Sequence, residues 1–333
     1  MCFLETAKDA GTSEEVEKEY LSELNEAGVY FEFIGSDARR FPWRGIRRMR
    51  NYVHTNHADI YHAHLTYGIL FGALVRVPRV YTHHSVSMRI GRLVFALMNP
   101  LIDQLVGISN KCAKVLSAHT GRKPSIIING VSFQRFSQQD LRPRKIGQRI
   151  SCISVGRICE EKNYELLVRA IARLPDGVRS NLSVKIAGAG PKLLAAKLEK
   201  RISDEGLGDV ILLLGNRSDI PALLASSQLF LMSSSSEGLP IALIEASVAG
   251  LPCVVTDVGG CSEIVDLCRN GIVVAPESPQ ALARAIENII SDPTQFTKLS
   301  ANALDNSKVF SIVAASESHI TLYECLLSSQ DDK

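Results

Sequence analysis

Two short apolar runs on either side of one helical segment limit most strongly how this chain can fold. Leu229-Phe-Leu-Met232 and Cys253-Val-Val-Thr256 are short and apolar, so each predicts a buried strand. Between them, Pro240 suits the first turn of a helix, and Gly250 with Pro252 ends it. A strand, a helix and a second strand in this order predict a parallel sheet with helical crossovers. We therefore expect an α/β fold.

Two glutamates stand around the start of this predicted helix. Glu237 falls in the loop at the carboxyl edge of the sheet, and Glu245 lies about one and a half turns into the helix. Helix N-termini at this edge attract anions such as a diphosphate, because unpaired N–H groups and the helix dipole point there. However, an acidic residue in such a place is commonly only a cap or a solvated side chain. The pair is a candidate site that the wider sequence must test.

The same alternation of apolar runs and helical segments occupies most of the chain. Further strands are predicted at 29–34, 59–64, 79–82, 103–109, 125–131 and 150–155, and in the runs that begin at Leu182 and Val210. Residues 138–149 are polar and basic, which is typical of a linker. Because 333 residues suffice for two domains, the sequence predicts one domain at residues 1–148 and a second at 149–333.

Basic residues are concentrated in the first half of the chain. Residues 1–150 contain 21 lysines and arginines and 13 acidic residues, whereas residues 151–333 contain 16 and 22. This asymmetry predicts an anionic partner for the first half, either a phosphate-bearing substrate or an anionic membrane surface. Nucleic acid fits less well, because the chain has one Trp, no basic tail and no recognisable binding module.

The segment from Trp43 to Val53 combines both kinds of surface. A helical projection places four apolar residues opposite three arginines: Trp43, Ile46, Met49 and Val53 against Arg44, Arg47 and Arg48. We favour a crossover helix that packs its apolar face on the sheet. A membrane-surface helix is the alternative, and both hold if the arginines face a bilayer.

The sequence also bears on location. No apolar run approaches the length of a transmembrane helix, and residues 1–5 lack the basic start and apolar core of a signal peptide. We expect a cytoplasmic protein whose basic first half makes peripheral contact with the inner face of an anionic membrane. The eight cysteines lack a Cys-x2-Cys pair and mostly stand in apolar contexts, so reduced core residues are expected.

The Glu237-Gly-Leu-Pro…Glu245 segment resembles the Glu-x7-Glu motif of the family-four retaining glycosyltransferases of the GT-B fold, and the resemblance extends over nearly the whole chain. It implies two Rossmann-like domains that face each other across a cleft. In that family the second Glu binds the ribose of a sugar nucleotide, which implies this role for Glu245. The first lies against the transferred sugar, which makes Glu237 a catalytic residue. Gly238 and Leu239 are implied donor-binding residues.

Two further segments complete the implied donor site. Gly156-Arg-Ile-Cys-Glu-Glu-Lys162 resembles the family's Gly-Arg-Leu…Lys-Gly segment, in which Arg and Lys grip the donor diphosphate, so Arg157 and Lys162 are implied to do so. Two cations at a strand edge suit the charge that develops on a departing nucleoside diphosphate. Without the resemblance, both would be read as surface charges. Arg217 follows the next strand and loop, where the family reads the nucleobase, and is a candidate contact for uracil or guanine.

The sequence departs from the family pattern at two positions. Asn163 replaces the usual Gly after the Lys, and since Asn tolerates unusual backbone angles, little harm is expected. Ser233 replaces a common Pro, which is expected to change loop rigidity more than chemistry. The segment after the second apolar run matches the family's Gly-Gly-x-x-Glu-Ile, in which Glu263 is expected to anchor the following helix rather than touch substrate.

Histidines mark the first half of the implied cleft. Asp59-Ile-Tyr-His-Ala-His64 resembles the family's Asp-Val-Val-His-Ala-His segment, which implies that His64 forms a catalytic wall of the sugar and acceptor site. A lone histidine at a strand end is usually structural, so this role depends on the resemblance. A second pair, His83-His84, ends the next strand and is a weaker candidate for the same cleft.

The resemblance implies a retaining glycosyltransferase. It would move a sugar from UDP, in preference to GDP, to a hydroxyl of a lipid-linked or polysaccharide acceptor, in the assembly of surface polysaccharide or lipopolysaccharide. No metal or other cofactor is expected, because Arg157 and Lys162 replace what Mg²⁺ does elsewhere. Two alternatives are a sugar-nucleotide epimerase or hydrolase of the same fold, and a non-catalytic subunit that binds sugar nucleotides.

The front of the chain departs from the family pattern. Family members open with a strand and a Gly-Gly loop leading into a helix, whereas here residues 1–4 already look like the second strand. The first Gly-Gly pair is Gly259-Gly260. We therefore expect that a first strand, loop and helix of the N-terminal domain, on the order of 30 residues, is missing. The 333-residue form would then be unstable and poorly active.

Overall fold

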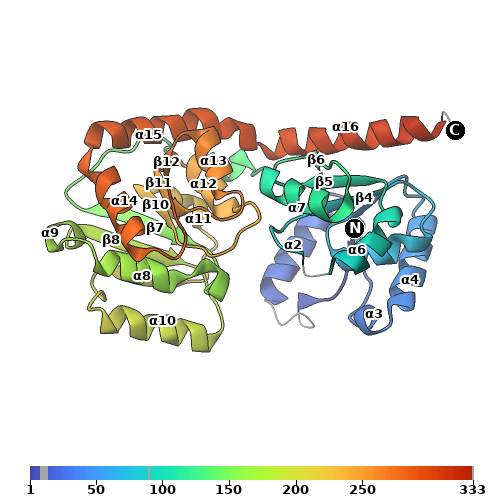
Figure 1. Cartoon of the computed structure of the whole chain (residues 1–333), viewed down its shortest axis with the longest axis horizontal. Coiled ribbons are helices and arrows are strands. Elements are labelled where there is room, and N and C mark those ends of the chain that lie inside the picture. Colours follow the sequence, from blue (N-terminus) through green and yellow to red (C-terminus); the bar gives the residue numbers. More distant parts are fainter. Residues whose placement is uncertain (8–13, 89–90, 332–333) are drawn as a thin grey trace.

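The computed structural model describes residues 1–7, 14–88 and 91–331. Figure 1 shows two α/β lobes side by side, with the last helix lying along the top of the right-hand, N-terminal lobe. The described strands form a six-stranded sheet, a four-stranded sheet and a separate pair, and every strand pairing within them is parallel. The α/β expectation with parallel sheets is confirmed.

The C-terminal domain is built on the six-stranded sheet. Its strands are β7 (Ile150–Val155), β8 (Leu182–Ala187), β9 (Ile211–Gly215), β10 (Leu229–Met232), β11 (Cys253–Thr256) and β12 (Gly271–Val274). Its helices are α8 (Tyr164–Ala172), α9 (Asp176–Arg179), α10 (Lys192–Asp204), α11 (Ile220–Ala225), α12 (Ile241–Val248), α13 (Cys261–Cys268), α14 (Pro279–Ser291) and α15 (Pro293–Asn306). The strand order is β12-β11-β10-β7-β8-β9. The chain thus builds outward from β7 in one direction and then returns to β7's other side, which places a topological switch point between β7 and β10.

The N-terminal domain is built on the four-stranded sheet, ordered β3 (Tyr61–Ala63), β4 (Arg79–His83), β5 (Gln104–Gly107) and β6 (Ser125–Ile126). Its helices are α2 (Glu14–Glu26), α3 (Asp37–Arg40), α4 (Pro42–Thr55), α5 (Thr66–Phe71), α6 (Arg92–Met98) and α7 (Asn110–Thr120). In the part of the chain that the structure describes, β1 (Cys2–Phe3) pairs only with β2 (Glu32–Phe33), apart from the four-stranded sheet.

Separate clusters of buried side chains hold the layers together. One covers the first face of the six-stranded sheet under α8 and α14, with Leu167, Ile171 and Ile286 fully buried. Another covers the opposite face under α12 and α13, and it also contains Val131 and Phe136 from beyond β6. The segment after the last N-terminal strand is therefore packed into the C-terminal domain before the linker begins.

Helix α4 packs on the N-terminal domain through Met49, Val53 and the partly buried Ile46, so the crossover-helix interpretation is confirmed for these residues. The prediction was wrong for Trp43, which is 63% exposed. The reason is that the helix makes its closest approach at Gly45, where an added Cβ would lie 2.4 Å from the Phe71 ring. Trp43 stands two residues before Gly45, about 200° around the helix, so its side chain faces away from this contact.

Helix α16 (Ile312–Asp331) crosses back from the C-terminal domain to the N-terminal one (Figure 1). Leu322 and Leu326 pack near Val80 and Val106 of the four-stranded sheet. The Tyr323 hydroxyl lies 2.6 Å from His62 Nδ1. The terminal helix therefore joins the end of the C-terminal domain to the sheet of the N-terminal domain. Within the described residues, no helix has the length and apolar content needed to span a bilayer.

Candidate active site

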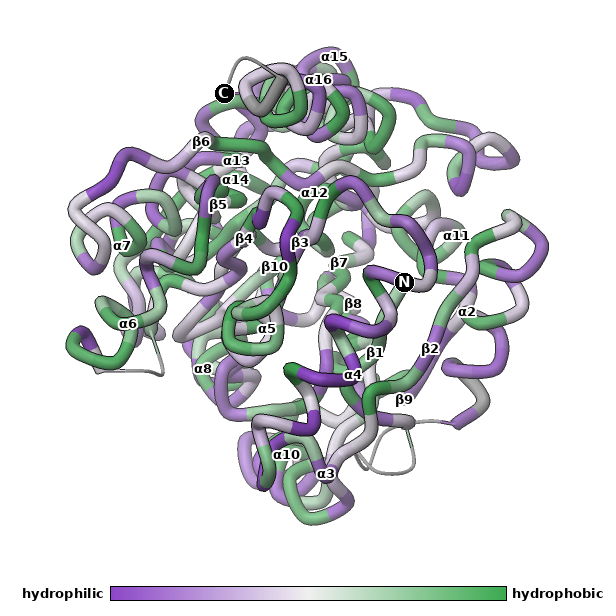
Figure 2. The backbone as a smooth tube through the Cα atoms, turned by 90° about the vertical axis from the view of Figure 1, so that its right-hand side faces the viewer, coloured by the Kyte–Doolittle hydropathy of each residue, from purple (hydrophilic) through white to green (hydrophobic). Residues whose placement is uncertain are grey.

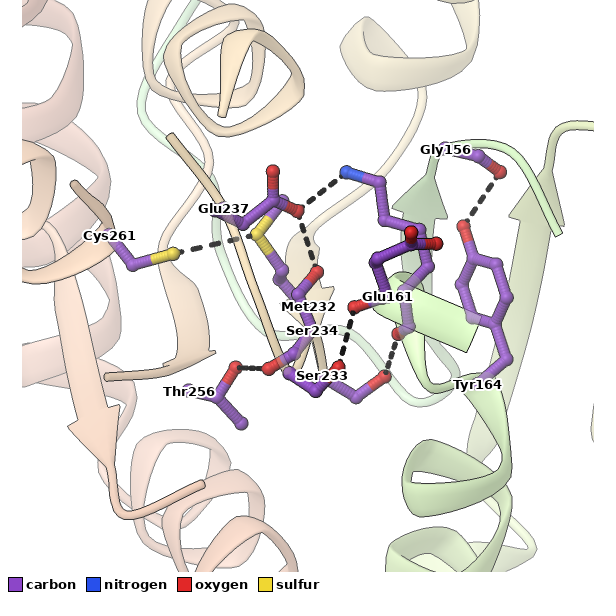
Figure 3. A network of polar contacts seen from close by, with 11 residues as sticks. Gly156, Glu161, Tyr164, Met232, Ser233, Ser234, Glu237, Thr256 and Cys261 are labelled. Atoms are coloured by element: carbon purple, nitrogen blue, oxygen red, sulfur yellow. Dashed lines mark hydrogen bonds and ion pairs between the residues drawn. The ribbon is translucent and has the colours of Figure 1, made fainter. Parts of the chain in front are cut away.

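The switch point between β7 and β10 brings two loops of the C-terminal domain together. In open parallel sheets, ligands bind where the strand order reverses, beyond the carboxyl ends of the strands. Lys162, in the loop after β7, donates through Nζ to Glu237 Oε1 at 2.6 Å, from the loop after β10. Ser234 donates to the same oxygen at 2.7 Å (Figure 3). The Lys162 and Glu237 side chains are only 20% and 12% exposed, so the pair is held rigidly at the edge of the sheet.

Backbone and hydroxyl hydrogen bonds fasten these two loops to each other. The Ser235 N–H donates to the Glu161 carbonyl at 2.8 Å, and the Thr256 hydroxyl donates to the Ser234 carbonyl at 2.6 Å (Figure 3). The Ser233 hydroxyl lies 3.1 Å from the Lys162 carbonyl and 3.0 Å from the Asn163 carbonyl. These contacts agree with the expectation that Ser233 changes loop rigidity more than chemistry, although the sequence did not predict the partners. A proline there could not donate, so the serine supplies a bond that fixes the Lys162 loop.

Asn163 has a left-handed backbone conformation, with φ 44° and ψ 50°. Its side-chain oxygen accepts a hydrogen bond from the Leu166 N–H at 3.3 Å and caps α8. Asparagine tolerates this conformation and is a preferred cap, so the prediction that Asn163 replaces glycine without harm to the backbone is confirmed.

Glu245 lies inside α12 with its side chain 9% exposed, and Arg135 donates from Nη1 to its Oε1. Burial raises the pKa of the Glu245 carboxyl, and the Arg135 charge and hydrogen bond oppose that rise. Arg135 belongs to the short 3-10 helix η3 (Phe133–Phe136) that follows the N-terminal domain. The structure therefore gives the two predicted glutamates different partners, Lys162 for Glu237 and Arg135 for Glu245.

Two glycines let neighbouring backbones pass very close to the Glu237 loop. At Gly259, where φ is +52°, an added Cβ would lie 1.8 Å from the Glu237 carbonyl oxygen. At Gly238, an added Cβ would lie 2.0 Å from the carbonyl oxygen of His84 in the other domain. Leu239, a predicted donor-binding residue, is 5% exposed and packs its side chain into the core beside α12. Any donor contact from Leu239 must therefore come from its backbone.

A cavity of about 1110 Å³ opens between the two domains on the same side of the sheet. Arg157 and Arg217 line it from the C-terminal domain, together with the glycine-rich turn at 188–190. Tyr20 of α2 and Phe33 of β2 face them from the N-terminal domain. Arg217 already binds Asp219 through two hydrogen bonds, at 2.8 and 2.6 Å. The cavity therefore has two arginines on its C-terminal wall, and aromatic side chains together with Glu5 and Glu17 on its N-terminal wall.

Histidines from two strands meet on the N-terminal side of the cleft. His64 Nδ1 lies 2.8 Å from His84 Nε2, and the His62 and His64 rings stack at 4.3 Å. The two histidines of the second pair, His83 and His84, do not act together. His83 is 5% exposed, and its Nδ1 lies 3.0 Å from the Tyr81 hydroxyl. His84 joins His64 and, through its carbonyl, abuts Gly238. The histidine cluster thus lies against the Glu237 loop.

These histidines should make folding stability sensitive to acid. Burial first, and then the charge of His119, lower the pKa of His83 to about 4, from an ordinary value near 6.5. Between these two values the unfolded chain binds more protons than the folded one, so stability falls as pH drops through this window. We expect a loss of about 1–2 kcal/mol between pH 7.5 and pH 5, measured by urea unfolding. This loss is the contribution of His83 alone, so His83→Gln should reduce the pH dependence by about that amount, and the lowered pKa values of His62, His64 and His84 should maintain the remainder. His54→Gln, at an exposed site, should leave the dependence unchanged. Equal pH slopes for wild type and His83→Gln would contradict the prediction.

Polar contacts also join the domains beside the Glu237 loop. Glu263, at the start of α13, accepts hydrogen bonds from the backbone and side-chain nitrogens of Asn110 at 2.9 and 2.8 Å. Lys111 donates to Asp257 at 2.7 Å. Glu263 was predicted to anchor the following helix, and this was wrong. Its carboxylate instead binds the start of α7 in the N-terminal domain. Sequence reasoning missed Asn110, Lys111 and Arg135, because nothing in their local sequence shows what they meet across the cleft.

Comparisons with known proteins agree with this architecture. The family model described as glycosyl transferases group 1 matches residues 138–306, and the model described as glycosyltransferase family 4 matches residues 6–135. A crystal structure of the Anabaena protein HepE in complex with UDP superposes with a TM-score of 0.78 at 20% identity, covering 92% of this chain and 89% of that one.

Among relatives with assigned activities, the lipopolysaccharide core biosynthesis mannosyltransferase LpsB of Rhizobium meliloti is 28% identical over 243 residues, which is 68% of this chain and 66% of the relative. The UDP-Gal:alpha-D-GlcNAc-diphosphoundecaprenol alpha-1,3-galactosyltransferase of Escherichia coli is 30% identical over 183 residues, 51% of this chain and 46% of the relative. The chain thus spans less than two thirds of either relative's length.

Together, the family models match both halves of the chain, and the fold is that of solved glycosyltransferases of the GT-B type. The chain belongs to the glycosyl transferases group 1, with a family-four N-terminal domain and a GT-B fold.

Proposed function

We propose that this chain transfers a sugar from a UDP-sugar to a hydroxyl of a lipid-linked or polysaccharide acceptor, with retention of the anomeric configuration. The observation that carries the proposal is the Lys162–Glu237 pair at the switch point, beside a cavity shared by two domains. It combines a cation suited to a diphosphate with a carboxylate suited to sugar hydroxyls. In the reaction, the bond from the anomeric carbon to the β-phosphate oxygen breaks and UDP leaves. The acceptor oxygen bonds to the same face of the anomeric carbon, and its proton passes to the departing diphosphate.

Each named residue takes one task in this proposal. Arg157 and Lys162 neutralise the charge that develops on the departing diphosphate, without a divalent metal. Glu237 positions the transferred sugar, and Glu245 binds the ribose hydroxyls. Arg217 reaches the base from the cavity wall, and the backbone of Gly238 and Leu239 completes the donor site. His64 forms the acceptor wall.

Similar proteins support the choice of donor and setting. LpsB is named for lipopolysaccharide core biosynthesis, and the Escherichia coli relative for UDP-galactose and a diphosphoundecaprenol acceptor. The HepE structure contains UDP. We infer a UDP-sugar in preference to a GDP-sugar, and a role in surface polysaccharide or lipopolysaccharide assembly.

A screen for nucleotide release tests the proposal. Incubation with UDP- and GDP-sugars, with and without a polyprenyl-linked sugar acceptor, should release UDP only when the acceptor is present. Turnover of donor without any acceptor would instead indicate an epimerase or hydrolase. If the protein binds the donor but does not turn it over with any acceptor, it is a non-catalytic subunit.

We also propose that the N-terminal domain touches the cytoplasmic face of an anionic membrane. Helix α6 is mostly hydrophobic (Figure 2), yet Leu93 and Leu97 are 84% and 79% exposed and Val94 is 52% exposed. Exposed lysines at 114 and 123 stand on or just after α7, which contacts α6. Apolar side chains beside basic ones suit the interface of a bilayer that contains anionic lipids.

Vesicle binding checks this contact. Leu93→Ser combined with Leu97→Ser should weaken co-sedimentation with phosphatidylglycerol vesicles roughly tenfold, because two leucines no longer enter the bilayer. The same changes should leave UDP binding intact. Leu193→Ser, at an 81% exposed site in the C-terminal domain, serves as the matched control. Unchanged sedimentation of the double variant would show that α6 is not the contact.

A further inference from the structure

We propose that Arg135 is a positioning residue for the donor: it holds the Glu245 carboxylate ready for the ribose hydroxyls. Donor affinity would then depend on a residue outside the Glu237–Glu245 motif, from the segment that joins the two domains. This inference rests on the proposed role of Glu245.

The backbone that carries Arg135 is fixed relative to α12. The Val131 N–H donates to the Phe310 carbonyl at 2.8 Å, and the Ile312 N–H donates to the Val131 carbonyl at 3.1 Å. On the other side of Arg135, Phe136 is 2% exposed and packs in the same core cluster as Leu243 and Ile244 of α12. Arg135 is therefore held between two anchors, each attached to the C-terminal domain.

Arg135 is also the charge that Glu245 needs. Among the described residues, Arg135 forms the one ion pair with Glu245, and no charged side chain of the neighbouring α13 or of η5 (Ser307–Phe310) contributes to the Glu245 pKa. Burial alone raises this pKa, so loss of Arg135 would raise it further. A protonated Glu245 could no longer form charge-assisted hydrogen bonds with a ribose, which are about twice as strong as neutral ones.

The contact with Arg135 uses one of the two oxygens of the Glu245 carboxylate. Arg135 binds Oε1 of Glu245, so Oε2 stays available to a ribose hydroxyl. The Arg135 side chain is 49% exposed, so it can keep its contact when a nucleotide approaches. The opposite possibility is that Arg135 occupies the ribose position and must leave, in which case its removal would tighten UDP binding.

Calorimetry of UDP binding between pH 6 and pH 8.5 separates these two roles. Arg135→Gln should weaken UDP binding about tenfold at pH 7, and the loss should grow as pH falls, because the Glu245 carboxylate is protonated more readily without its cation. Arg135→Lys should keep most of the affinity. Adding Glu245→Gln to Arg135→Gln should abolish the pH dependence. Arg142→Gln, at a 76% exposed linker site, is the matched control. Equal or tighter UDP binding by Arg135→Gln, or a pH profile like that of wild type, would overturn the inference.

Glu245→Ala keeps this inference distinct from the proposed function. If Glu245→Ala does not weaken UDP binding, the ribose role itself is wrong. If Glu245→Ala weakens it and Arg135→Gln does not, the ribose role stands and only the positioning role of Arg135 fails. Thermal unfolding of each variant shows whether it is folded, and Arg135→Lys supplies a charge-preserving variant should Arg135→Gln unfold.

Discussion

Replacing Glu237 with alanine is expected to slow sugar transfer by about 100-fold or more, while the affinity for UDP changes less than about threefold. The carboxylate faces the transferred sugar in our proposal, and removing one preorganised polar group from a reacting centre typically costs this much in rate. UDP lacks the sugar and so does not use this contact. Lys162 loses its partner at 2.6 Å, which leaves it free to bind the diphosphate.

Two variants sharpen this test. Glu160→Ala, at an exposed site in the neighbouring loop, should behave as wild type. Glu245→Ala should show the reverse pattern to Glu237→Ala, with UDP affinity reduced by about 1.5–3 kcal/mol because charge-assisted bonds to the ribose are lost. If Glu237→Ala and Glu245→Ala weaken UDP binding equally, the division of roles between the two glutamates is wrong.

Replacing Lys162 with methionine is expected to weaken UDP binding about 100-fold while the affinity for uridine stays within about twofold. Only the diphosphate carries the charge that pairs with Lys162, and a partly buried ion pair of this kind is worth up to about 3 kcal/mol. Calorimetry with both ligands measures the contrast. Arg157→Met should show the same preference for the diphosphate, since Arg157 lines the shared cavity.

Folding must be separated from binding in the Lys162 variant. Glu237 is 12% exposed and would lose its cation, which leaves a nearly buried carboxylate with the Ser234 hydroxyl but no opposite charge. Lys162→Met with Glu237→Gln removes both charges and should recover stability but not UDP affinity. Lys197→Met, at a 73% exposed site, is the control. A uridine loss as large as the UDP loss would mean that Lys162 holds the fold rather than the phosphates.

Local patterns predicted the elements of this fold well, and contacts between distant segments poorly. Residues 229–232 and 253–256 form β10 and β11 with the predicted limits, because strands covered on both faces need uniformly apolar side chains. The ion pair between Lys162 and Glu237 joins residues 75 apart in the sequence. It depends on β7 and β10 being neighbours, which no local pattern shows.

Contacts between distant segments also account for the site residues that the sequence did not predict. The resemblance to family motifs predicted a role for Glu245, but its partner Arg135 stands 110 residues earlier and carries no pattern of its own. Ser233 was read as a departure from a motif, although its hydroxyl bonds the Lys162 loop. Trp43 fitted the helical projection and still faces solvent, because the contact at Gly45 turns the helix.

The central claim is that this site transfers a sugar with retention, and the anomeric configuration of the product tests it most directly. An α-linked UDP-sugar and a polyprenyl-linked acceptor would be incubated with the protein, and the new linkage read from the anomeric proton coupling by NMR. Our account predicts an α-linked product that disappears with Glu237→Ala. A β-linked product would contradict it.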